Sequence, residues 1–133
     1  MSVRMGVSPI GWSNDDMRDL GAEISLDQCL RDAREVGYVG IELGHKFPRE
    51  PQALQAVLRE HQLALVSGWY GSHLLERSVE DELAALEPHL NLLIALGCDV
   101  LVLAEVTGSV HGMKNVPWNR RPILHPGARQ RLY

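Results

Sequence analysis

The sequence predicts an α/β fold in which short parallel strands alternate with helices. Short apolar runs alternate with longer segments whose apolar residues recur at helical spacing, and these longer segments carry residues typical of helix ends. Hydrophobic residues make up 45% of the 133 residues and charged residues 23%, as in an average globular domain. This composition excludes disordered, collagen-like and coiled-coil proteins.

The first predicted strand covers residues 5–10 and ends at Gly11, and a polar loop over residues 13–16 follows it. A helix is predicted to begin at Ser25, because Ser25 and Gln28 form a capping-box pattern, and Gly37 should end it. The expected inner face of this helix consists of Leu26, Cys29, Leu30, Ala33 and Val36.

The second predicted strand covers residues 39–43, and the second helix begins around Pro51, a residue favoured in the first helical turn. Leu54, Val57 and Leu58 are expected to form the inner face of this helix. The third strand is predicted over residues 63–67, with Gly68 at its end.

The third helix is predicted to begin at Ser78 and to end at Gly97. Pro88 falls inside it and should kink or divide it. A fourth strand, residues 99–104, follows. The apolar face expected for this helix consists of Val79, Leu83, Leu86, Leu90 and Leu93.

Strands that alternate with helices predict a parallel sheet with right-handed crossovers. An open doubly wound sheet and a (β/α)8 TIM barrel, or part of one, both share this pattern. The turn after the first strand, residues 9–14, lacks the Gly-rich phosphate-binding pattern expected of a dinucleotide-binding sheet. We therefore expect part of a barrel, with about four parallel strands and three to four helices.

In a barrel, the loops that follow the strands meet at one rim and carry the chemistry. Aromatic side chains there offer flat faces for a sugar ring, and polar side chains offer directional hydrogen bonds to its hydroxyl groups. The candidates for proton transfer are Glu42 and Lys46. The candidates for substrate binding are Trp12, Asn14, Asp15, Trp69, Tyr70, Glu105 and Thr107.

Each candidate also has a structural interpretation. Glu42 either faces a ligand or pairs with a core lysine or arginine, since a buried carboxylate needs a partner. Lys46 is either functional or a solvated loop residue, and Trp12 and Trp69 either line a pocket or cap the core. Asp16 is better explained as a turn residue. Of the histidines, His45, His73 and His111 are candidates for the rim, whereas His61 and His89 are expected at the surface or in packing.

Several classes of partner and location are disfavoured. The net charge is −4, without the basic field of nucleic-acid binders, and no run approaches the length of a membrane span. The N-terminal residues lack the apolar region of a secretory signal. Cys29 and Cys98 form neither a CxxC pair nor a disulfide framework, and both are expected in the core. A reducing, cytoplasmic setting is expected.

Four motifs, in order, resemble those of inosose dehydratases (2-keto-myo-inositol dehydratases) of the xylose-isomerase-like barrel superfamily. They are residues 9–17, residues 40–49, residues 65–70 followed by 74–78, and residues 104–109. The resemblance extends from about Met5 to about Leu124. Family members are about twice as long, and eight βα units fill about 250 residues. The resemblance therefore implies an N-terminal half of a barrel over residues 1–124. Residues 125–133 are either a tail or the start of the fourth helix.

The resemblance implies a carbon–oxygen lyase that removes water from 2-keto-myo-inositol (scyllo-inosose) in inositol catabolism. It also implies Co²⁺ or Mn²⁺ and glutathione as cofactors, with the metal ligands in later strands, so no metal ligand is assigned here. Two copies are expected to pair through open strand edges as a homodimer. The alternatives are a ketose isomerase or epimerase, an inactive truncated lyase, and a non-catalytic half-barrel that self-associates.

Overall fold

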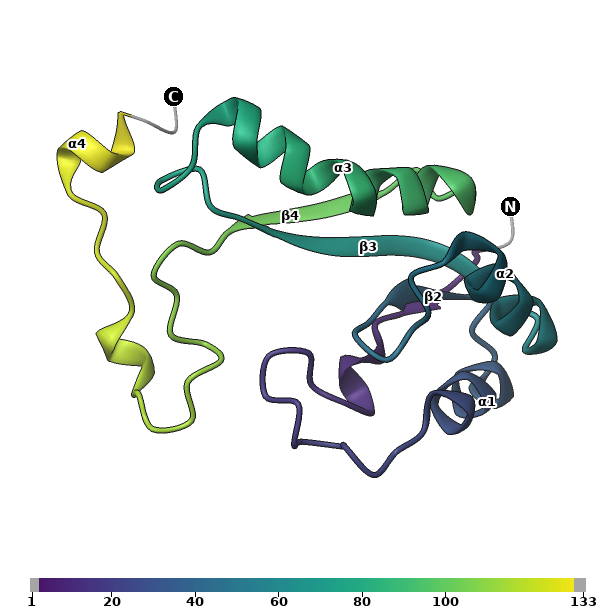
Figure 1. The fold of residues 1–133 in the computed structure, drawn as a ribbon. Coiled ribbons are helices and arrows are strands. Elements are labelled where there is room, and N and C mark those ends of the chain that lie inside the picture. Colours follow the sequence, from purple (N-terminus) through teal and green to yellow (C-terminus); the bar gives the residue numbers. More distant parts are fainter. Residues whose placement is uncertain (1–2, 131–133) are drawn as a thin grey trace.

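The computed structural model describes residues 3–130 (Figure 1). Its strands are β1 (Gly6–Val7), β2 (Gly40–Leu43), β3 (Ala64–Ser72) and β4 (Leu101–Glu105). Its α-helices are α1 (Leu26–Val36), α2 (Pro51–Glu60), α3 (Val79–Ala95) and the short α4 (Pro126–Arg129). Two 3-10 helices, η1 (Pro9–Gly11) and η2 (Trp118–Arg120), complete the elements. Among the described residues, no helix is long and apolar enough to cross a lipid bilayer.

The sheet is parallel throughout, and its strands lie side by side in chain order, β1-β2-β3-β4. A doubly wound sheet would reverse its strand order at a switch point. The observed order is that of a (β/α) barrel, which confirms the predicted fold class. In Figure 1, β3 and β4 run beneath α3, whereas α1 and α2 lie near β2.

The predicted helix ends are confirmed by their capping contacts. The Ser25 hydroxyl accepts a hydrogen bond from the Gln28 amide at 3.1 Å, and Gly37 ends α1 with a left-handed φ of 103°. The Ser78 hydroxyl accepts from the Asp81 amide at 3.1 Å at the start of α3. These local contacts depend on neighbouring residues only, which explains why the sequence reveals them.

Strand boundaries depend on pairing and were predicted less well. Gly68 does not end β3, because β4 pairs with it from Gly68 to Ser72 and so prolongs it. The first strand is shorter than predicted and stops at Val7. Pro9, which has no N–H to donate to a sheet, instead opens a 3-10 turn.

The predicted inner face of α3 was right at Leu93 and wrong at Val79, Leu83 and Leu90. The helix is not divided at Pro88, and its buried residues are Glu82, Leu92 and Leu93. Val79 and Leu83 are exposed instead. The reason lies in β3: Gly68 has no side chain, so Leu93 and His89 approach its backbone, where an added Cβ would lie 2.7 Å from Leu93 Cδ2. This close packing sets the rotation of the helix.

The core lies between the sheet and the helices. Leu30 of α1, Ile41 of β2 and Leu54 of α2 are completely buried. Cys29 and Cys98 are both buried free thiols, and burial raises the pKa of Cys29 to about 11, so it stays protonated at neutral pH. This environment agrees with the expected packing role of the cysteines.

A β-bulge shapes the inner face of the sheet. Ile41 pairs with Leu65 but Glu42 pairs with Ser67, so Val66 is the extra residue of β3. A Cβ at Gly40 would lie 2.2 Å from the Val66 side chain, and one at Gly6 would lie 2.8 Å from it. The paired glycines of β1 and β2 therefore make room for the bulged valine.

The two faces of α1 provide a test of this packing. Val36, predicted on the inner face, is 72% exposed because it is the last residue of the helix before the Gly37 cap. We expect Leu30→Ala to lower the free energy of unfolding by about 2–5 kcal/mol. We expect Val36→Ala to change it by less than about 1 kcal/mol. Urea unfolding followed by circular dichroism measures both, and equal losses would contradict the packing.

Candidate active site

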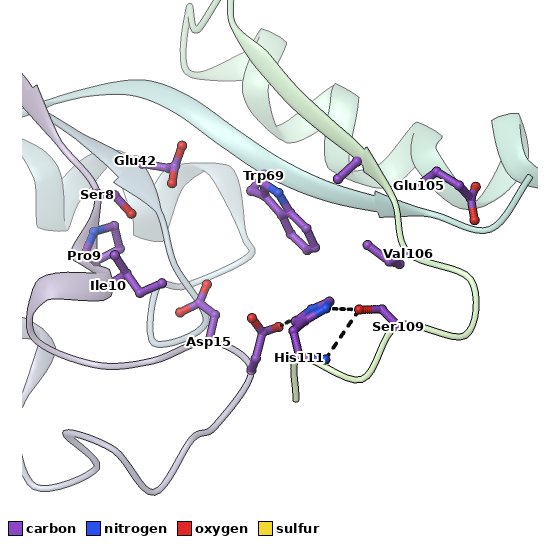
Figure 2. Close-up of a pocket in the computed structure, with 12 residues that line it drawn as sticks. Ser8, Pro9, Ile10, Asp15, Glu42, Trp69, Glu105, Val106, Ser109 and His111 are labelled. Atoms are coloured by element: carbon purple, nitrogen blue, oxygen red, sulfur yellow. Dashed lines mark hydrogen bonds and ion pairs between the residues drawn. The ribbon is translucent and has the colours of Figure 1, made fainter. Parts of the chain in front are cut away.

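A cavity of about 460 Å³ lies at the carboxyl ends of the strands (Figure 2). This is the position where a (β/α) barrel places its chemistry. Carboxylate, hydroxyl and imidazole groups face aromatic and aliphatic carbon across it. The polar lining residues are Ser8, Asp15, Asp16, Glu42, Glu105, Ser109 and His111, and the apolar ones include Pro9, Ile10, Trp69 and Val106.

Glu42 lies within β2 and lines the cavity. The Ser67 hydroxyl, which the bulge places opposite it, donates a hydrogen bond to Glu42 Oε2 at 2.7 Å. Among residues 3–130, no lysine or arginine forms an ion pair with Glu42. The structure therefore favours the interpretation in which Glu42 faces a ligand over pairing with a core cation.

Trp69 supplies the aromatic surface of the cavity. Its side chain lies between Glu42 and His111 in Figure 2, and the residue is 42% exposed. A large apolar ring that stays this accessible beside polar groups suits the apolar face of a sugar or cyclitol. This arrangement favours a pocket-lining role for Trp69 over a core cap.

The loop after β1 and the loop after β4 meet at the cavity. Asp16 Oδ1 lies 3.2 Å from His111 Nε2, and the other ring nitrogen of His111 contacts the Ser109 hydroxyl. Asp15 also lines the cavity, and its Oδ1 lies 2.7 Å from His45 Nδ1. Only Oδ1 of Asp15 and Oδ1 of Asp16 are engaged in these contacts, so each carboxylate keeps one oxygen for a ligand hydroxyl.

The sequence had suggested His111 only as a rim residue, had favoured Asp16 as a turn residue, and had not suggested Ser109. Their place in the cavity follows from the meeting of two loops far apart in the chain. In the sequence, only position indicated that these residues line a cavity: Asp16 follows the first strand, and Ser109 and His111 follow the fourth.

Three of the predicted substrate-binding residues turn away from the cavity. The Trp12 indole donates to Asp32 Oδ2 of α1 at 3.0 Å, so it packs against the helix. Asn14 Oδ1 accepts from the Asp16 and Met17 amides and closes a local turn. The Tyr70 hydroxyl donates to Glu82 Oε1 of α3 at 2.7 Å.

Lys46 and Thr107 are also absent from the cavity lining. The Lys46 ammonium donates to backbone carbonyls of the loop before α1. The Thr107 amide donates to Glu105 Oε1 at 2.8 Å. Of the rim candidates, His73 lies outside the lining and donates its amide to Glu82 at 3.1 Å.

Glu105 borders the cavity, but its carboxylate is committed elsewhere and points away from Trp69 in Figure 2. Burial acts to raise its pKa, yet hydrogen bonds outweigh burial and lower it. The donors are the Thr107 and Leu74 amides, each at 2.8 Å, and the Ser72 hydroxyl at 3.2 Å. Glu105 therefore stays ionised and joins the ends of β3 and β4.

The metal implied by the resemblance finds no site in the described part of the chain. Within residues 3–130, no group of three or more histidine, cysteine, aspartate or glutamate side chains is arranged to hold a metal ion. Asp15, Asp16 and Glu42 line one cavity without converging as a ligand set. The residues present do not fit the cofactor.

The parallel strand order and the position of the cavity define the class of fold as part of a (β/α) barrel. The chain also resembles the crystal structure of apo 3-keto-D-glucoside 4-epimerase, YcjR, from E. coli, with a TM-score of 0.55 and 14% identity. The match covers 98% of this chain and 48% of that protein. At this identity the likeness shows the fold alone, and it confirms the predicted half-barrel.

Proteins of similar sequence include inosose dehydratases and a rhizopine catabolism protein. The chain is 34% identical over 123 residues to the inosose dehydratase of Geobacillus thermodenitrificans, covering 92% of this chain and 41% of the relative. It is 37% identical over 113 residues to that of Lacticaseibacillus casei, covering 85% and 38%. It is 43% identical over 124 residues to the rhizopine catabolism protein MocC of Rhizobium meliloti, covering 93% and 38%.

The chain spans about two fifths of the length of the curated relatives it matches. No protein-family model matches it. The similarity over more than four fifths of the chain confirms the resemblance that its motifs indicated: this chain is related to part of the inosose dehydratases.

The Tyr70–Glu82 contact leads to a prediction about pH. The Tyr70 hydroxyl, the His73 amide and the Arg77 guanidinium together lower the pKa of the Glu82 carboxyl below its ordinary value of 4.5. A lowered pKa in the folded state contributes stability above the unfolded-state pKa, and that contribution disappears as pH falls through the folded-state value. We therefore expect Glu82→Gln to destabilise the protein most at neutral pH.

The difference in unfolding free energy between wild type and Glu82→Gln should shrink on acidification below pH 4.5. Chemical unfolding at a series of pH values measures it. Glu80→Gln is the control, since Glu80 lies in the same first turn of α3 but is exposed. A loss for Glu82→Gln that is independent of pH would contradict this role.

Proposed function

We propose that this chain carries the substrate-binding face of an inosose dehydratase and takes part in the removal of water from 2-keto-myo-inositol. The observation that carries the proposal is Glu42, a carboxylate without a cationic partner among residues 3–130 that faces a cavity beside Trp69. The inosose dehydratases among the sequence relatives support the choice of reaction and substrate.

The chemistry follows from the position of the groups. The Glu42 carboxylate takes the proton from the ring carbon next to the ketone, and the C–O bond on the following carbon breaks as the C=C bond forms. The proton held by Glu42 then passes to the departing hydroxyl, which leaves as water. The resulting enol rearranges to a diketone. Because Glu42 gives up the same proton that it takes, one carboxyl group is enough when the proton and the hydroxyl leave from the same face of the ring.

The other lining groups would hold the ring in place. Asp15 and Asp16 each offer a carboxylate oxygen, and Ser109 offers a hydroxyl, to the hydroxyl groups of a cyclitol. Trp69 would cover the apolar face of the ring. Among the predicted binding residues, Trp12, Asn14, Tyr70, Glu105 and Thr107 would act by supporting these walls, through the contacts described above.

The proposal includes Co²⁺ or Mn²⁺ and glutathione as cofactors and a cytoplasmic location. No step of the reaction described above uses the metal, because residues 3–130 offer no set of ligands for it. Two buried free thiols, Cys29 and Cys98, suit a reducing compartment.

We also infer that two copies of this chain associate. β1 and β4 form the two edges of the sheet, and Val102 and Leu103 of β4 are 40% and 51% exposed. Pairing β4 of each copy with β1 of the other would cover these edges and extend the parallel order. Light scattering on the purified protein should give the mass of a dimer, and the mass of a monomer at high concentration would contradict the pairing.

The activity is tested by following diketone formation from 2-keto-myo-inositol, with cobalt or manganese and glutathione supplied. We expect turnover by the wild type, and a loss of about a hundredfold or more in kcat for Glu42→Gln, because the base is removed. Glu60→Gln, at the exposed end of α2, is the matched control and should remain active.

Circular dichroism establishes that all three proteins are folded. Full activity of Glu42→Gln would remove Glu42 from the reaction. A folded wild-type protein without turnover would contradict the catalytic proposal and favour a non-catalytic half-barrel.

A further inference from the structure

The ammonium group of Lys46 is fully occupied by one loop. Lys46 Nζ donates to the carbonyl of Gly21 at 2.7 Å, to that of Ala22 at 3.3 Å, and to that of Ile24. An ammonium has three N–H donors and no acceptor, so these contacts use its whole capacity. Lys46 forms no ion pair with a carboxylate among the described residues.

The loop that Lys46 holds is closed on itself. The Asn14 amide donates to the Leu20 carbonyl at 3.0 Å, and Gly21 lies against the Trp12 backbone. A Cβ at Gly21 would lie 1.9 Å from the Trp12 carbonyl oxygen, and Gly21 has a φ of 75°, so only glycine fits there. The two ends of the loop therefore meet, as in a compact Ω-loop.

Lys46 binds the base of this loop, whereas its neighbour His45 binds the tip. The His45 amide donates to Asp15 Oδ1 at 3.3 Å, and its ring nitrogen lies 2.7 Å from the same oxygen. Lys46 itself is fixed by the next residue, Phe47, which is 4% exposed in the core. The turn after β2 thus holds the loop after β1 at two points, and the loop carries Asp15 and Asp16 to the cavity wall.

We propose that Lys46 is a positioning residue, which clamps the loop of residues 12–24 so that Asp15 and Asp16 face the cavity. This assignment replaces proton transfer as the role of Lys46. The ammonium has no donor left for a substrate, and the residue lies outside the cavity lining. The proposal that Lys46 holds the loop is argued from the hydrogen bonds alone. Only its contribution to catalysis rests on the proposed function.

The two lysines of the chain permit a test on the unmodified protein. Lys114 is 58% exposed in its side chain and pairs with Asp19 at the surface. With a limiting amount of an amine-acetylating reagent, peptide mass spectrometry compares the two rates. We expect Lys46 to react at least about tenfold more slowly than Lys114, because its hydrogen bonds must open first. Equal rates, or faster reaction at Lys46 as for an activated catalytic amine, would overturn the clamp.

Proteolysis tests the effect on the loop. Arg18 is exposed within the loop, whereas Arg34 lies in α1. We expect Lys46→Met to raise the rate of cleavage by an arginine-specific protease after Arg18 by about tenfold or more, with cleavage after Arg34 unchanged, because local opening exposes the loop alone. Lys114→Met, which removes an exposed ion pair to the same loop, should change cleavage after Arg18 by less than about threefold.

Lys46→Arg keeps the charge and the N–H donors, so it should restore much of the protection at Arg18. If Lys46→Met fails to fold, the acetylation rates and Lys46→Arg decide the question. The proposal would be overturned if Arg18 is protected from cleavage in the wild type and a folded Lys46→Met protein is cleaved there at the same rate. Because neither measurement uses a substrate, an absence of dehydratase activity would leave the clamp intact and contradict only the proposed function.

Discussion

The space beside Gly6 and Gly40 is the constraint on which the inner face of the sheet depends. Val66 fills it, and any side chain at Gly40 would collide with that valine. Val66 reaches this position because β3 carries one extra residue between its pairings with Ile41 and Glu42. Bulges of this kind redirect side chains next to functional sites. Here the bulge brings Ser67 opposite Glu42, so the steric fit of two glycines and one valine also determines which hydrogen bond holds the candidate base.

The rest of the cavity is assembled by loops that hold one another. The turn after β2 binds the loop after β1 through His45 and Lys46, and that loop reaches the loop after β4 through the pair of Asp16 and His111. Each contact joins residues far apart in the chain. The polar groups on these loops are therefore positioned by tertiary contacts, whereas Glu42 and Trp69 are positioned by strands. Binding groups on rigid strands keep their geometry when loops move, which suits the part of the site that would carry the chemistry.

The sequence predicted the elements and their order well because these depend on local patterns. The Ser25 and Ser78 caps and the alternation of strands with helices are visible without knowledge of neighbours. Most of the inner face of α3 was predicted incorrectly because the rotation of this helix depends on its close packing against Gly68, a residue without a side chain. Trp12 follows its strand as predicted, whereas Tyr70 lies inside β3, and their polar atoms bind Asp32 and Glu82 on helices. Position along a strand predicts the rim, but it does not predict the direction in which a side chain with a polar tip points.

The most direct test of the cavity as a binding site is a titration of the isotopically labelled protein with 2-keto-myo-inositol, followed by NMR. The account predicts saturable shifts of residues that line the cavity, among them the amides of Asp15, Asp16, Glu42 and Ser109 and the side-chain signals of Trp69 and His111. Signals of the groove near Arg31 should not move. An absence of shifts at millimolar ligand, or shifts that map to residues outside the cavity, would contradict it.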